Sequence, residues 1–185
     1  MDAAAGRVDV VLAYNSDQRD QRMRFSTEPV VREEVAVFYN RKRPVQFQQL
    51  EDLAGYRGGL LYGESYGAEF DRFVARHQNI ERVSSSQQNF GKLIRGRIDY
   101  VIQERRTGQL FIEHLPGAQD IRVLPSALSV DYLRVAVSRQ SPLSQHMDEI
   151  DAQLRRMNQA GEIARWLEQS EVTSRDMINL PADAR

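Results

Sequence analysis

Short apolar runs alternate with amphipathic stretches along most of the chain, and this alternation constrains the fold more than any other feature. The runs have the length and composition of buried strands, and the stretches between them place apolar residues on one face at helical spacing. Strands that are connected through helices in this way form a mostly parallel sheet, so the sequence predicts an α/β fold. The predicted strands are residues 8–13, 34–39, 59–62, 80–83, 98–103, 121–124 and 132–138.

Helices are predicted between these strands and throughout the last third of the chain. Residues 67–77 and 86–95 each carry a one-sided apolar stripe. From 143 to 157 apolar residues follow one another at steps of three and four, and the pattern resumes after Gly161. After Ser170 it fades, which predicts a polar tail at the end of the chain.

One sequence segment occurs twice. Residues 6–13 read GRVDVVLA, and residues 96–103 read GRIDYVIQ, with the same glycine, arginine and aspartate before a strand. Each copy is followed by a polar segment, at 14–19 and at 104–108. The carboxyl ends of parallel strands are where open α/β sheets bind ligands. The repeat therefore predicts two similar lobes with ligand-binding residues at these two strand ends.

Composition excludes several classes of function. The chain has 25 basic and 26 acidic residues and no basic block, so it lacks the positive surface that nucleic-acid binding requires. It has no cysteine, and its apolar runs are far shorter than the roughly 20 residues of a membrane span. Its first residues do not have the pattern of an export signal. His77, His114 and His146 are isolated, so neither a metal site nor a cofactor is predicted.

Several short motifs follow one another in a distinctive order. They are Gly6 to Ala13, Arg19 ahead of Phe25-Ser26 and Pro29, Leu50-Glu51-Asp52-Leu53-Ala54-Gly55, Gly59-Leu60-Leu61-Tyr62-Gly63 with Ser65-Tyr66-Gly67, Gly96-Arg97-Ile98-Asp99, and Val135-Ala136-Val137. This collinear set resembles the bacterial extracellular solute-binding proteins of the polar amino-acid type. These are the periplasmic binding proteins of ABC importers, with a type II Venus-flytrap fold. The resemblance spans about residues 6–169.

The resemblance implies a two-lobed fold of mostly parallel sheets flanked by helices, with the N-terminal part of the first lobe lacking. The implied divisions are 1–41 for the remainder of lobe one, 42–128 for lobe two, 129–170 for the return to lobe one with its C-terminal helices, and 171–185 for a tail. Segments near 34–41 and 129–138 would pass between the lobes as hinges.

The resemblance also implies a set of ligand-binding residues. They are Tyr14, Arg19, Ser65, Tyr66, Gly67 and Glu104. Arg19 would pair with a ligand carboxylate, since a guanidinium group binds a carboxylate through two parallel hydrogen bonds. The alternative interpretation is that Arg19 is a solvated arginine in a loop. Glu104 lies where the resembled family places the acid that pairs with the ligand ammonium group. Its alternative is a surface ion pair with Arg105 or Arg106, which contributes little to stability.

Residues 65–67 lie at the N-terminus of a predicted helix, just after a buried strand. Free backbone amides and the helix dipole attract anions at such a position, so these residues are candidates for binding an anionic group. The alternative for Ser65 is a plain N-cap of the helix.

The function that the resemblance implies is capture of an amino acid or a similar small polar solute in an interlobe cleft, without catalysis and without a cofactor. The resemblance also implies an ABC permease as the protein partner and the periplasm as the location. An incomplete lobe one could form a contact between two copies in a dimer. Two alternatives stay open on the same fold. One is a ligand-sensing module of a signalling protein. The other is an enzyme that resembles cyclohexadienyl or arogenate dehydratases, with Glu104 as general acid.

Overall fold

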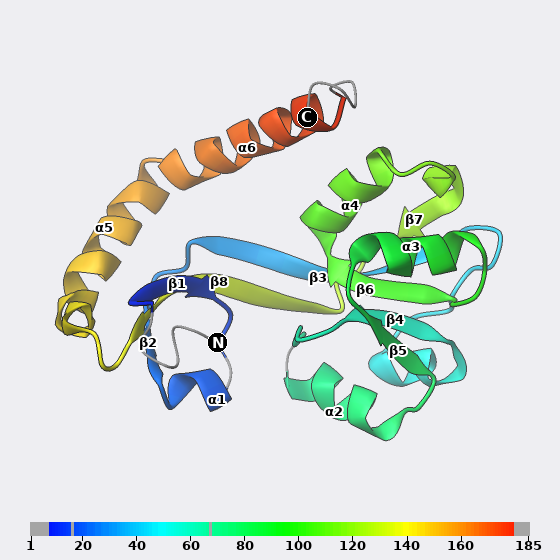
Figure 1. The fold of residues 1–185 in the computed structure, drawn as a ribbon, viewed down its shortest axis with the longest axis horizontal. Coiled ribbons are helices and arrows are strands. Elements are labelled where there is room, and N and C mark those ends of the chain that lie inside the picture. Colours follow the sequence, from blue (N-terminus) through cyan, green and yellow to red (C-terminus); the bar gives the residue numbers. More distant parts are fainter. Residues whose placement is uncertain (1–7, 16, 67, 180–185) are drawn as a thin grey trace. The chain divides into compact units, whose positions relative to one another are not determined.

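The computed structural model describes residues 8–15, 17–66 and 68–179, and the chain folds into an α/β structure with an eight-stranded sheet (Figure 1). The strands are β1 (Val10–Ala13), β2 (Met23–Phe25), β3 (Val31–Asn40), β4 (Gly58–Leu61), β5 (Ile80–Val83), β6 (Tyr100–Glu104), β7 (Ile121–Val123) and β8 (Ser129–Ser138). The α-helices are α1 (Asp17–Asp20), α2 (Ala68–Arg76), α3 (Ser86–Ile94), α4 (Arg105–Glu113), α5 (Met147–Gln159) and α6 (Glu162–Asn179). The predicted fold class is confirmed.

The chain divides into two compact units. Unit 1 comprises Met1–Arg32 and Tyr132–Arg185, and unit 2 comprises Glu33–Asp131. One division falls within β3 and the other within β8, so these two long strands carry the chain from one unit to the other.

Three elements have no counterpart among the sequence predictions, and one of them, α1, has only four residues. Strand β2 has only three residues, too few to show a periodic pattern. Helix α4 begins directly after Glu104 with two arginines in its first turn and has Gly108 in its interior. Cations at the amino end of a helix oppose the helix dipole, and glycine lowers helix propensity, so the local sequence conceals this helix.

The sheet is mixed, which corrects the prediction of mostly parallel sheets. Strand β4 runs parallel to β5 and to β6. Strands β1 and β2 pair with β8, and β6 and β7 with β3, in antiparallel orientation. Parallel pairing needs a crossover connection, and α2 and α3 supply it only along the path from β4 through β5 to β6.

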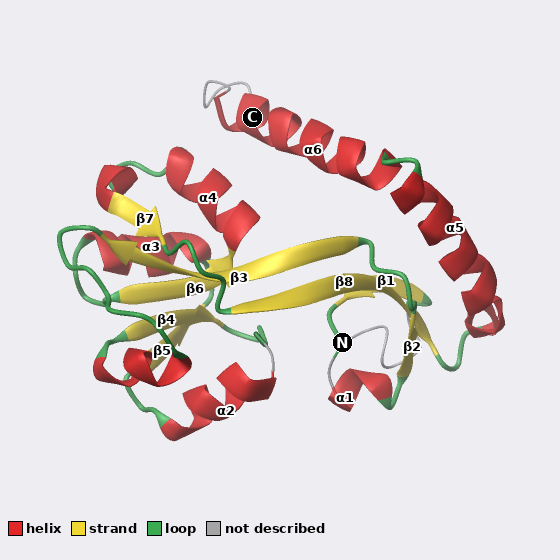
Figure 2. Ribbon diagram, turned by 180° about the vertical axis from the view of Figure 1, so that it is seen from behind, coloured by secondary structure: helices red, strands yellow, loops and turns green. Residues whose placement is uncertain are grey.

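In unit 2, helix α2 lies on one face of the sheet and α3 on the other (Figure 2), and each face has an apolar core. On one face, Phe70 and Phe73 of α2 pack with side chains of β3 and β6. On the other face, Phe90 and Leu93 of α3 pack against Phe38 of β3, and the rings of Phe38 and Phe90 meet edge to face. The apolar stripes predicted for these two helices therefore form the contacts expected of them.

Unit 1 is built around β8 and the C-terminal helices. Ser26, which follows β2, is buried, and its amide donates to the Val135 carbonyl at 2.8 Å. The adjoining turn is tied to α5, because the Glu28 amide donates to Asp151 Oδ1 at 3.0 Å and Arg155 Nε donates to Glu28 Oε1 at 2.8 Å. The Phe-Ser-x-x-Pro motif therefore forms a turn that connects β8 with α5.

Helix α6 extends through Asn179, which corrects the prediction of a tail from residue 171. The helix continues although the apolar pattern weakens, because helix formation is cooperative and adds a hydrogen bond with each residue. None of the helices in the described part of the chain has the length and apolar character that crossing a membrane requires.

Candidate functional site

The predicted ligand-binding residues of unit 2 lie at one edge of its sheet. Strands β4 and β6 are parallel, with Gly58 opposite Tyr100, so both strands end at the same edge. Glu104 is the last residue of β6, and Ser65 and Tyr66 follow β4 after a short turn. We refer to the edge formed by Ser65, Tyr66 and Glu104 as the carboxyl edge. It is the position at which open α/β sheets bind ligands.

The turn after β4 is held in place by Arg82 of β5. Arg82 Nη1 donates to the Leu61 carbonyl at 2.8 Å and to the Glu64 carbonyl at 3.0 Å. Gly63 has φ of 78°, a left-handed conformation that glycine adopts at little cost. These contacts fix where the chain presents Ser65 and Tyr66. Arg82 was not among the predicted site residues, since nothing in its local sequence indicates bonds to a distant turn.

Asp71 of α2 occupies the donors that precede the helix. Ser65 Oγ donates to Asp71 Oδ2 at 2.5 Å, and the Tyr66 amide donates to Asp71 Oδ1 at 3.3 Å. The carboxylate lies in the first turn of α2, where the helix dipole stabilises a negative charge. The chain thus supplies an anion of its own at the position where sequence reasoning expected a ligand anion. The position of Asp71 in the first turn of a predicted helix was the sequence feature from which this role could have been predicted.

Tyr66 combines deep burial with an unsatisfied hydroxyl group. Its side chain is 2% exposed, and its Oη has no hydrogen-bond partner within the described residues. Burial raises the pKa of Tyr66, and the carboxylates of Glu104 and Glu64 raise it further, so the phenol is neutral and carries its proton. A buried hydroxyl group without a partner is unfavourable, which makes this atom a candidate contact for a ligand.

Glu104 is partly buried on the same face of the sheet as Tyr100 and Ile102, because side chains alternate along β6. Burial raises the pKa of Glu104, and the nearby carboxylates of Glu64, Glu33 and Asp131 raise it further. Sequence reasoning missed these three acids, because they come from separate segments that only the fold brings together.

The alternative of a surface ion pair for Glu104 is wrong. Arg105 Nε pairs with Glu34 Oε2 at 2.8 Å, and Arg106 Nε lies 3.8 Å from Glu33 Oε1. Both arginines thus pair with acids of β3. Within the described residues, the carboxylate of Glu104 takes part in no ion pair.

The other predicted residues lie in unit 1 or outside the described residues. Arg19 lies in α1, and its Nη1 donates to the Tyr14 carbonyl at 2.9 Å, so the structure brings these two residues together at the carboxyl end of β1. Gly67 lies outside the described residues. Among the described residues, no three His, Cys, Asp or Glu side chains form a group that could hold a metal ion.

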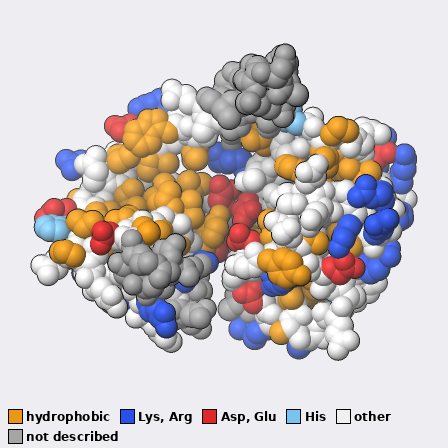
Figure 3. Space-filling view, viewed as in Figure 1, with side chains coloured by type: hydrophobic (Ala, Val, Ile, Leu, Met, Phe, Trp, Pro, Cys, Tyr) orange, Lys and Arg blue, Asp and Glu red, His pale blue; other side chains and the backbone are white. Residues whose placement is uncertain are grey.

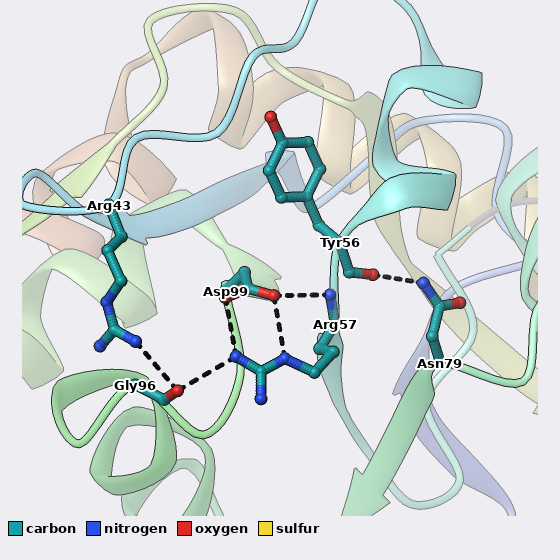
Figure 4. A network of polar contacts seen from close by, with 6 residues as sticks. All are labelled: Arg43, Tyr56, Arg57, Asn79, Gly96 and Asp99. Carbon is teal, nitrogen blue, oxygen red and sulfur yellow. Dashed lines mark hydrogen bonds and ion pairs between the residues drawn. The ribbon is translucent and has the colours of Figure 1, made fainter.

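The Gly-Arg-x-Asp motif of unit 2 lies at the opposite end of β6 and has a structural role (Figure 4). Asp99 Oδ2 accepts from the Arg57 amide at 2.9 Å and from Arg57 Nε at 3.1 Å, while Oδ1 accepts from Arg57 Nη2 at 3.1 Å. The Gly96 carbonyl accepts from Arg57 Nη2 and from Arg43 Nη1. The motif therefore anchors the amino end of β6 to the segment that begins β4.

No protein-family model and no curated protein sequence matches the chain. Solved structures do match it. An amino-acid ABC transporter substrate-binding protein from Streptococcus pneumoniae, bound to L-arginine, is similar with a TM-score of 0.73 and 20% identity, over 94% of this chain and 72% of that one. A mutant of ArgBP from T. maritima gives a TM-score of 0.73 and 19% identity, over 91% of this chain and 71% of that one.

A histidine kinase sensor domain with similarity to periplasmic binding proteins is also similar. It gives a TM-score of 0.74 and 18% identity, over 91% of this chain and 72% of that chain. At these identities the likeness concerns the fold, and it confirms the fold that the motif order implied. The chain therefore has the α/β fold of the periplasmic binding proteins.

Proposed function

We propose that this chain is a solute-binding protein that captures an amino acid or a similar small polar solute for ABC-type import. The observation that carries the proposal is the likeness to amino-acid-binding proteins over more than nine-tenths of the chain, for example 94% in the S. pneumoniae protein. The predicted ligand-binding residues of unit 2 share a sheet edge, which supports the same function. An ABC permease is then the proposed partner, and the periplasm the proposed location.

In this proposal each end of the ligand has its own protein group. Arg19 pairs with the ligand carboxylate through its guanidinium group, and Glu104 accepts hydrogen bonds from the α-ammonium group. The unpaired carboxylate of Glu104 is suited to this role, because no protein cation within the described residues competes for it. The protein binds its ligand without changing it.

Binding of a panel of L-amino acids tests the proposal, measured by thermal shift and isothermal titration calorimetry. At least one amino acid should stabilise the protein, because a ligand that binds only the folded state raises its unfolding temperature. Arg19→Ala should weaken the binding of this amino acid by about 2 kcal/mol or more, since a charged hydrogen-bonding partner is removed. Arg22→Ala is the matched control, because Arg22 is exposed and next to α1. Absence of binding by the whole panel would contradict the proposal.

Sensing is the second candidate function, and the similar kinase sensor domain is the observation that favours it. The two functions share a ligand and differ in the partner. Binding of the liganded protein to a permease, reconstituted in nanodiscs, would support import. Conversion of prephenate or arogenate to a product would contradict both import and sensing, and would indicate that the protein is an enzyme.

A further inference from the structure

Several acids of unit 2 gather at the carboxyl edge, although they lie far apart in the sequence. Val35 of β3 pairs with Glu104, so Glu33 lies two residues farther along the same face. Glu64 belongs to the turn after β4, and Asp131 follows Leu128, whose amide bonds to the Val35 carbonyl at 2.8 Å. In keeping with these positions in the fold, the carboxylates of Glu64, Glu33 and Asp131 each raise the pKa of Glu104. Acidic side chains also gather in one place on the face shown in Figure 3.

The arginines at this edge balance only part of the negative charge. Arg106 is paired with Glu33, whereas the guanidinium group of Arg82 bonds to backbone carbonyls. Within the described part of the chain, neither Glu64 nor Glu104 takes part in an ion pair. Two neighbouring carboxylates that lack ion-pair partners repel each other, and a bound cation would relieve this repulsion.

Tyr66 is an independent indication that a ligand belongs here. Its hydroxyl group is buried and lacks a partner within the described residues, and Glu104 is the charged group that acts on it most strongly. The phenol oxygen can accept a hydrogen bond from an ammonium or guanidinium group while the hydroxyl proton points to an acceptor. A cationic ligand group bound beside Glu104 would thus give both groups a partner.

An anionic group would find two of the donors at this edge already engaged. The Ser65 hydroxyl and the Tyr66 amide both donate to Asp71. A ligand with a side-chain carboxylate would therefore bring a further negative charge near Glu64 and Glu104 without gaining these donors, which is unfavourable.

We propose that the ligand carries a positively charged group in addition to its α-ammonium group, so that unit 2 selects cationic amino acids over neutral and acidic ones. This inference rests on the proposed function and narrows its ligand class. One cationic group of the ligand binds Glu104 and Tyr66, and the second lies near Glu64.

Calorimetry with L-arginine, L-lysine, L-glutamine, L-glutamate and putrescine tests this inference. L-Arginine or L-lysine should bind about tenfold or more tightly than L-glutamine, and L-glutamate should bind most weakly. Glutamine or glutamate binding as tightly as the cationic amino acids would overturn the inference and leave the proposed function intact. Binding of putrescine without any amino acid would support the acidic site and overturn the proposed function. Absence of binding by all five compounds would contradict both.

Glu64→Gln separates a charge effect from a structural one. Glu64 is exposed, and its carboxylate should contribute to affinity only through the second cation of the ligand. The variant should therefore lower the affinity for L-arginine about threefold and leave the affinity for L-glutamine unchanged. Glu51→Gln is the matched control, since Glu51 is an exposed acid of unit 2 that belongs to the segment before β4. It should leave both affinities unchanged. Equal weakening of arginine and glutamine by Glu64→Gln would overturn the role of the second charge.

Discussion

The two copies of the Gly-Arg-x-Asp sequence form strands of very different character. In β6, the side chains of Tyr100, Val101 and Ile102 are all 0% exposed. In β1, Val10 is 40% exposed and Leu12 is 55% exposed, and apolar side chains cover the surface over β1 and β8 in Figure 3. The same local sequence thus forms a strand in both units, but only one of the two strands is part of a closed core.

The difference follows from the number of neighbours that each strand has. Strand β6 lies between β3 and β4, and helices cover both faces of the sheet around it. Strand β1 stands at the end of the strand order and pairs only with β8 within the described residues. An apolar edge strand of this kind is open to pairing with another chain. The sequence of a strand therefore predicts its conformation, whereas its burial depends on segments elsewhere.

Hydrogen exchange should show the largest difference between the two strands. Amides of β6 bond to strands on both sides, whereas half of the β1 amides face an edge that no other described strand pairs with. We expect the most protected amides of β6 to exchange about a hundredfold or more slowly than those of β1. Equal protection in a monomer, confirmed by sedimentation, would show that β1 is covered in solution. Equal protection only in a dimer would support a second copy as the cover.

Val11 and Val101 occupy equivalent positions in the two copies and allow a matched mutation. Val101→Ala removes two methyl groups from a fully buried site, and we expect a loss of about 2 kcal/mol in unfolding free energy. Val11→Ala should cost about 1 kcal/mol or less, because Val11 is only partly buried. Urea denaturation followed by circular dichroism measures both values. Similar losses would mean that the core of unit 1 is as tightly packed as that of unit 2.

Asp9 and Asp99 provide a second matched pair. Asp99→Asn weakens bonds that the carboxylate accepts from Arg57, and we expect a loss of about 1 kcal/mol at neutral pH. Asp9 is exposed, so Asp9→Asn should stay within about 0.5 kcal/mol of the wild type.

The pH dependence distinguishes the charge of Asp99 from its packing. Hydrogen bonds from Arg57 lower the pKa of Asp99 in the folded state. A lowered pKa stabilises the folded state above the ordinary aspartate pKa, and this contribution is lost as the pH falls through the lowered value. Wild type and Asp99→Asn should therefore converge in strong acid. A difference that persists there would indicate that the asparagine disturbs packing.

Local patterns predicted most elements of the fold, including every strand with four or more residues. They did not predict α4, whose amino end lacks capping signals, nor the antiparallel pairing of β3 and β8 with their neighbours. At the candidate site, the motif order pointed to Ser65, Tyr66 and Glu104. Asp71 and the acids around Glu104 were missed, because their roles arise from pairing between β3, β4 and β6. Such contacts join distant segments and leave no periodic signal in the sequence.

The residue directly after each copy of the repeat sharpens the comparison. It is Tyr14 after residues 6–13 and Glu104 after residues 96–103. Burial at the end of β6 raises the pKa of Glu104. The folded state therefore holds a proton more tightly than the unfolded state, and stability falls as the pH rises from the ordinary glutamate pKa through the raised value. Glu104→Gln removes the ionisation, so it should raise the unfolding temperature at neutral pH by about 2 °C, the shift that about 1 kcal/mol or less produces in a chain of this size. The gain should vanish below the ordinary glutamate pKa, where both forms are neutral. Differential scanning calorimetry across pH measures this, with Glu51→Gln as the exposed control. A loss of stability in Glu104→Gln at neutral pH would mean that the carboxylate stabilises the fold, whereas a gain together with weaker ligand binding would mean that the protein retains an unfavourable charge for the ligand.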